Sequence, residues 1–302
     1  MSARTQKTKS TKNTARPEKI FAPLPSVFAI INNTIKHIKT NKKLFAKVTL
    51  IYIALLLLFV WSGGGLINAT QTKQTVNQAL GTSGNNIMAN LTVFSMLLGS
   101  GSSSSNNELK SLYQTIIVIL LGLVFIWVFR HTKIDKVQKI KARDPFYKGM
   151  TPLVPFLLVL LVVGIQLLPL LFGSALLGIV FGNGLAVNPL EQTLWITLFL
   201  LTFALSAYWL ASSLFALIIV TLPEMTPLKA LRTAKKMVKG RRFAIIKKLL
   251  GATFLALVLV GSVVLATIYV APVIAQTLLI VFGIMLLPVA TGYIYVLYQE
   301  ML

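Results

Sequence analysis

The residues that could carry acid–base, nucleophilic or metal chemistry are few. The 302-residue chain has no cysteine, two histidines and seven acidic residues, so thiolate catalysis, disulfides and cysteine metal sites are excluded. His37 and His131 stand in basic segments, without a partner at metal-ligand spacing, and we interpret both as solvated. No nucleophile elbow, glycine-rich phosphate loop or His-Glu pair is present. We therefore predict a non-enzyme with no cofactor and no metal site.

The acidic residues also limit transport chemistry. All seven lie outside long apolar runs or at their ends: Glu18, Glu108, Asp135, Asp144, Glu191, Glu224 and Glu300. Proton and ion relays across a membrane usually need buried acids, because an intramembrane charge is costly. A proton-coupled pump is therefore not expected, whereas a carrier of neutral or lipidic substrates stays open.

A few polar or helix-breaking residues lie inside the apolar runs. Gln166 precedes Pro169 by three residues, and Pro169 frees the carbonyl of Ile165. Gln166 is either a polar point on a substrate path or part of a kink with an interhelical hydrogen bond, and we favour the second interpretation. Pro288 should kink a second run. A further polar group is interpreted as helix-packing residues: Ser206, Tyr208, Ser212 and Ser213.

The apolar runs predict an all-α integral membrane protein. The chain is 56% hydrophobic and 12% charged, and a run of about 20 apolar residues can span a bilayer. We predict six transmembrane helices, arranged as three hairpins with amphipathic helices on the cytoplasmic side. Their expected ranges are 47–66, 112–129, 152–177, 192–222, 249–269 and 274–298.

Basic residues lie almost entirely on one side of these spans. Of 29 Lys and Arg, 27 fall in the segment up to Lys47, in the loop 130–150 or in the loop 223–248. Only Lys73 and Lys110 fall in the predicted outer loop 67–111. The positive-inside rule then places both termini in the cytoplasm, and we expect the spans to lie in a bacterial inner membrane. It also accounts for the net charge of +22 without nucleic acid as a partner.

The N-terminal part is expected to form a tail and a surface helix, both preceding the first span. Residues 1–22 read as a disordered basic tail, and 23–302 as the membrane domain. After Ser26, which suits an N-cap, apolar and polar residues alternate with helical spacing, which predicts a helix in the membrane interface. Its apolar face would hold Val27, Phe28, Ile31, Ile35 and Ile38, and its polar face Asn33, Lys36, His37 and Thr40. In the loop 130–150, Asp144-Pro145 is expected to end any helix.

The loop 223–248 contains the best-defined amphipathic helix. Thr226 suits the N-cap, Pro227 the first turn, and Gly240 a stop. The apolar face comprises Ala230, Leu231, Ala234, Met237 and Val238, and the basic face Lys229, Arg232, Lys236 and Lys239. Three interpretations stay open: attachment to anionic lipid headgroups, docking onto a cytoplasmic partner as a coupling helix does, or an ordinary positive-inside anchor.

Residues 226–242, from Thr226 to Arg242, follow an Ala-Leu-basic pattern that ends in a glycine flanked by basic residues. This pattern, with the six-span plan, resembles the membrane domain attached to some bacterial glycerophosphodiester phosphodiesterases and its stand-alone relatives. The resemblance implies a fold and no activity, because the chain has no phosphodiesterase catalytic domain.

Two functional hypotheses follow. The leading one is a non-enzymatic membrane protein that contacts anionic lipid or envelope machinery. The alternative is a permease subunit for an uncharged or amphiphilic substrate, driven by a separate ATPase. Either function would use the same contact residues: Lys229, Arg232, Lys236, Lys239, Arg241 and Arg242.

Overall fold

A computed structural model describes residues 24–61, 108–132, 141, 143–182, 185 and 188–302. Within these residues the chain is helical and contains no strand. The elements are α1 (Val27–Thr40), α2 (Lys42–Leu56), the π-helical turn η1 (Leu57–Trp61), α5 (Glu108–His131), α6 (Asp144–Gly149), α7 (Leu153–Gly182), α8 (Pro189–Ile219), α9 (Pro227–Val238), α10 (Arg242–Val270) and α11 (Pro272–Gln299). The predicted tail 1–22 and most of the loop 67–111 lie outside the described residues.

Six of these helices are long and apolar enough to cross a membrane, as the sequence predicts. They occupy Lys42–Val60, Ser111–His131, Leu153–Phe181, Pro189–Ile219, Arg242–Val264 and Thr277–Gln299. The chain is thus built as a multi-pass membrane protein. The first and fifth spans belong to helices that begin several residues earlier than expected, at Lys42 and Arg242. Lysines and arginines are good helix formers, so a basic flank continues a helix rather than ending it.

The helix ends follow local sequence signals. Ser26 Oγ accepts a hydrogen bond from the Ala29 backbone N–H at 3.2 Å and caps α1. Thr226 caps α9 in the same way, with Pro227 in the first turn, and Gly240 after the helix has φ 89°, which favours glycine. At Asp144-Pro145 the short helix α6 begins, because proline fits a first helical turn. Whether a helix ends before it is untested, because residues 133–140 lie outside the described residues.

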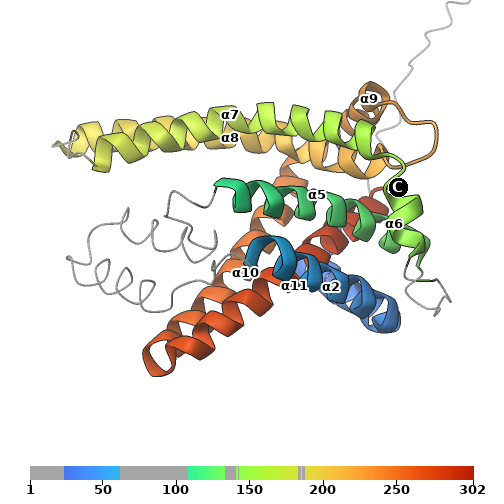
Figure 1. The fold of residues 1–302 in the computed structure, drawn as a ribbon. Coiled ribbons are helices and arrows are strands. Elements are labelled where there is room, and N and C mark those ends of the chain that lie inside the picture. The colour runs from blue at the N-terminus through green and yellow to red at the C-terminus, as the bar shows by residue number, and fades with distance from the viewer. Residues whose placement is uncertain (1–23, 62–107, 133–140, 142, 183–184, 186–187) are drawn as a thin grey trace, which may run out of the picture.

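Helices α7 and α8 pack along each other over most of their length (Figure 1). They approach closely at Gly173, where an added Cβ would lie 3.1 Å from Thr202 Cβ and closer still to its hydroxyl oxygen. Small residues let membrane helices approach this closely, so Gly173 helps to set the spacing of the pair. Helices α10 and α11 form a second packed pair, in which Tyr293 donates a hydrogen bond to the Lys248 carbonyl at 2.9 Å.

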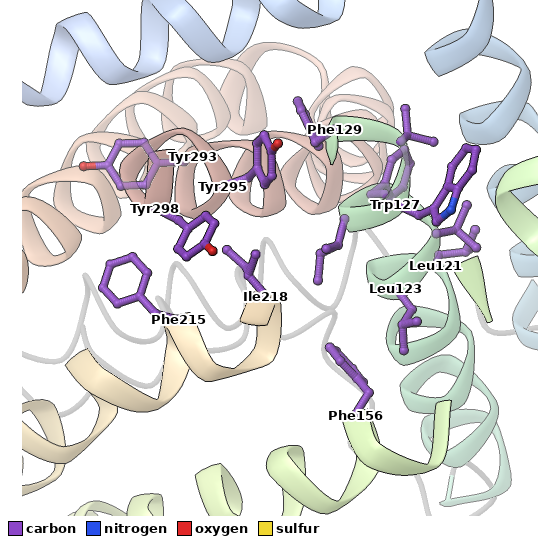
Figure 2. Close-up of a cluster of buried hydrophobic side chains, with 14 of the residues drawn as sticks. Leu121, Leu123, Trp127, Phe129, Phe156, Phe215, Ile218, Tyr293, Tyr295 and Tyr298 are labelled. Atoms are coloured by element: carbon purple, nitrogen blue, oxygen red, sulfur yellow. The ribbon is translucent and has the colours of Figure 1, made fainter. Parts of the chain in front are cut away.

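The two helix pairs meet at one end and diverge from it (Figure 1). The shared end, which also holds α6, α9 and the C-terminus, contains the aromatic core. Figure 2 shows Phe129 of α5, Phe215 of α8 and three tyrosines of α11 gathered there. Phe129 is completely buried, with its ring centroid 4.9 Å from that of Phe45 and 6.0 Å from that of Tyr295. Away from this end the spans expose their apolar side chains, and only 6% of the most apolar stretch of α10 is buried, against 56% for α5.

Helix α1 is part of this core, and its faces match the prediction only in part. Val27, Ile31 and Ile38 of the predicted apolar face are partly buried against the core. Its buried residues are Ile30, Thr34 and His37, whereas Phe28 of the predicted apolar face is 69% exposed. The helix packs on α11 at Gly292, where an added Cβ would lie 2.6 Å from a Thr34 methyl carbon. The physical reason is that a threonine and a neutral histidine can be buried when hydrogen bonds offset part of the cost. Thr34 donates to the Ile30 carbonyl and His37 bonds to Thr132, so residue polarity alone misassigned part of the buried face.

Candidate functional site

The apolar face of α9 is covered by protein. Ala230, Ala234 and Val238 are fully buried, and Leu231 and Met237 are partly buried against the same core. The helix contacts α8 and α7 (Figure 1). Because the buried residues include two alanines, α9 lies close against the end of the α7–α8 pair. An interfacial helix would instead bury this face in lipid, so the predicted apolar face of α9 is not available to the membrane.

The opposite face of α9 carries a cluster of exposed cations. Lys229, Arg232, Lys236 and Lys239 were predicted from the sequence, and Lys235 joins them because it lies four residues before Lys239 and three after Arg232. We call these five residues the α9 basic face. Within the described part of the chain, none of their side chains has an ion-pair partner. Leu228, which is 67% exposed, lies on the same side of α9, four residues before Arg232.

The two remaining predicted contact residues lie at the start of α10. Arg241 and Arg242 are half-buried, and the Arg242 guanidinium carbon lies 4.2 Å from the centroid of the Tyr208 ring of α8. This distance is typical of a cation–π contact. Arg242 is therefore held against the protein, unlike the α9 basic face. Phe243, next to it, is 88% exposed and was not singled out from the sequence.

The polar residues inside the spans make a contact between helices. Gln166 Oε1 of α7 accepts a hydrogen bond from Ser213 Oγ of α8 at 2.6 Å, as the structural interpretation of Gln166 predicts. Helix α7 runs unbroken through Pro169, and α11 runs unbroken through Pro288. The kinks expected at these prolines stay predictions.

The two histidines have different environments. His131 is exposed, whereas His37 is 1% exposed, so the prediction that His37 is solvated was wrong. His37 Nε2 lies 2.8 Å from Thr132 Oγ1, and its ring packs edge-on against Phe129. Burial lowers the pKa of His37 below 6.5, although a hydrogen bond with the Thr132 backbone opposes the shift. A neutral imidazole packed in this way is a structural residue.

Among the residues that the structure describes, no group of three His, Cys, Asp or Glu side chains could hold a metal ion. The α9 basic face instead combines charge and exposure on a helix whose opposite side is fixed to the protein. No family model matches the chain, and neither a curated protein nor a solved structure shows significant similarity to it. The resemblance of residues 226–242 to a phosphodiesterase membrane domain therefore stays a prediction from the sequence.

Proposed function

We propose that this chain is a non-enzymatic protein of a bacterial cytoplasmic membrane that contacts anionic lipid headgroups through the α9 basic face. Its six spans form three hairpins, with both termini and α9 in the cytoplasm. The 27 basic residues on that side support this orientation, because cytoplasmic loops of membrane proteins are enriched in Lys and Arg.

One observation carries the proposal. The buried side of α9 is fixed to α7 and α8, so its cations point away from the protein without a described ion-pair partner. Each Lys or Arg near an anionic membrane surface contributes about 1 kcal/mol of attraction. The exposed Leu228 and Phe243 favour lipid over an aqueous partner, because apolar side chains beside cations are typical of a membrane interface.

The test measures lipid selectivity around the full chain in nanodiscs of phosphatidylcholine. Spin-labelled phosphatidylglycerol should be immobilised more than spin-labelled phosphatidylcholine. The α9 variant, in which Lys229, Arg232, Lys236 and Lys239 are changed to Gln, should lose most of this preference. High salt should weaken the preference in the wild type. A matched control changes four tail cations, Arg4, Lys7, Lys9 and Lys12, to Gln and should keep the preference. Equal phosphatidylglycerol preference in the α9 variant and the wild type would refute the proposal.

The docked position of α9 also favours the alternative, a permease subunit. A short helix fixed across the ends of two spans, with a charged outer face, could transmit movement from an ATPase to the spans. In that case an identified nucleotide-binding subunit should copurify with the full chain. This subunit should no longer copurify with the α9 variant, whereas the lipid preference of the variant should equal that of the wild type. A preparation that shows lipid selectivity and contains no ATPase would exclude this alternative.

A further inference from the structure

The crossing of α8 and α10 holds an arginine in a fixed position. The Arg242 guanidinium lies over the Tyr208 ring, and the two helices contact each other. Stacking uses the face of the guanidinium and leaves the N–H groups at its edge available. Within the described residues, the Arg242 side chain has no hydrogen-bond acceptor and no ion-pair partner. The crossing therefore holds the guanidinium N–H donors of Arg242 in a fixed position, and an oxyanion is the acceptor that suits them best.

The length of α8 allows this arginine to lie at the level of lipid headgroups. From Pro189 to Tyr208 the helix has about 20 residues, which at 1.5 Å per residue span roughly 30 Å, the thickness of the hydrocarbon core. With Pro189 at one boundary, Tyr208 reaches the other. Tyrosine is enriched at that depth. The exposed Phe243 beside Arg242 is a second aromatic residue suited to the same interface.

Apolar surfaces lead away from the crossing into the membrane. On α8, Leu201 and Leu205 lie on the same side as Tyr208 and are exposed. On α10, Leu250 and Phe254 are exposed beyond the first two turns. The α7–α8 and α10–α11 pairs diverge from their shared end (Figure 1), and these four apolar side chains stay exposed on the two helices.

We propose that the α8–α10 crossing binds one anionic phospholipid. Its phosphate accepts hydrogen bonds from Arg242, and its acyl chains lie against the apolar surfaces of α8 and α10. Phosphate is favoured because its oxygens match the two-pronged edge of a guanidinium. The inference rests on the proposed contact with anionic lipid and adds a specific single-lipid site to the diffuse attraction of the α9 basic face.

Native mass spectrometry of the detergent-purified full chain tests this site. After addition of phosphatidylglycerol, the wild type should retain a one-lipid adduct that phosphatidylcholine does not form to the same extent. Arg242→Gln should lower the adduct population roughly fivefold, the equivalent of about 1 kcal/mol. Tyr208→Leu should also lower it, because the guanidinium loses its support. Tyr208→Phe keeps the ring and should retain the adduct.

The α9 variant separates this site from the proposed function. With Lys229, Arg232, Lys236 and Lys239 changed to Gln, the one-lipid adduct should persist even though the diffuse preference is lost. An unchanged adduct in both Arg242→Gln and Tyr208→Leu would overturn the site and leave the proposed function standing. Equal binding of phosphatidylcholine and phosphatidylglycerol by the wild type would overturn the single-lipid site as well. If these two variants lose the adduct but the α9 variant keeps its phosphatidylglycerol preference in nanodiscs, only the diffuse contact is rejected.

Discussion

His37 of α1 donates a hydrogen bond from Nε2 to Thr132 Oγ1, over 2.8 Å. The direction follows from the threonine, whose own proton goes to the Val128 carbonyl at 2.7 Å. The hydroxyl can then only accept from the imidazole. Nδ1 is left as the unprotonated nitrogen, and it is buried without a described partner. A second proton on this ring would place a charged N–H in an aromatic core.

This arrangement predicts that acid destabilises the protein through His37. The folded pKa of His37 is lowered, so below pH 6.5 the unfolded chain binds a proton that the folded chain does not. His37 has no effect well above pH 6.5, and stability is lost as the pH falls through that value. Thermal unfolding in detergent should show a larger loss between pH 7.5 and about 5.5 for the wild type than for His37→Leu. Identical pH dependence in both proteins would contradict the prediction.

The second prediction concerns the packing of α1 on α11. Gly292→Ala would place a methyl group against Phe129 and Thr34, and overpacking of this kind costs about 1–3 kcal/mol. The variant should melt at a lower temperature and exchange the amide hydrogens of α1 faster. Gly283→Ala in the same helix is the matched control, because its Cβ would meet nothing within 4 Å. Equal behaviour of the two variants would mean that α1 does not pack on α11.

The sequence predicts the helices better than it predicts what covers them. Ser26, Thr226 and Gly240 act on backbone groups within a few residues, so their effect can be read locally. The buried face of α1 depends on Thr132, 95 residues away from His37, and no local pattern reveals that partner.

The candidate site shows the same division. The alternation of apolar and basic residues assigns two faces to α9, but it does not tell whether lipid or protein covers the apolar one. That question is answered by the burial of Ala230 and Ala234. The position of Arg242 over Tyr208 depends on the crossing of α8 and α10, which only the tertiary structure shows.

The third prediction concerns the spacing of α7 and α8. Gly173→Ala would push a methyl group into Thr202, so the pair must separate or Thr202 must move. The variant should be destabilised by about 1–3 kcal/mol. Adding Thr202→Ala removes the atoms nearest the new methyl group and should restore part of the loss. Gly164→Ala, where nothing lies within 4 Å of the added Cβ, should be neutral. No rescue by Thr202→Ala would show that the two positions do not meet.

The fourth prediction concerns Gln166 and Ser213. Ser213→Ala leaves the Gln166 amide oxygen without this donor, and Gln166→Leu leaves the serine without this acceptor. Hydrogen bonds between membrane helices contribute about 0.6 kcal/mol on average. A double-mutant cycle on unfolding in detergent should give a coupling energy of that order. A coupling energy of zero would show that the hydrogen bond contributes nothing to the α7–α8 contact.

The last prediction concerns orientation, and the structure determines where a probe can be placed. The chain has no cysteine, so single cysteines can be introduced without background labelling. Ala234 is fully buried and would stay silent from either side, whereas Thr233 is exposed on α9. In intact cells an impermeant maleimide should label Ser103→Cys and not Thr233→Cys. Permeabilised cells should label both. Labelling of Thr233→Cys in intact cells would place the α9 basic face outside and refute the proposed orientation.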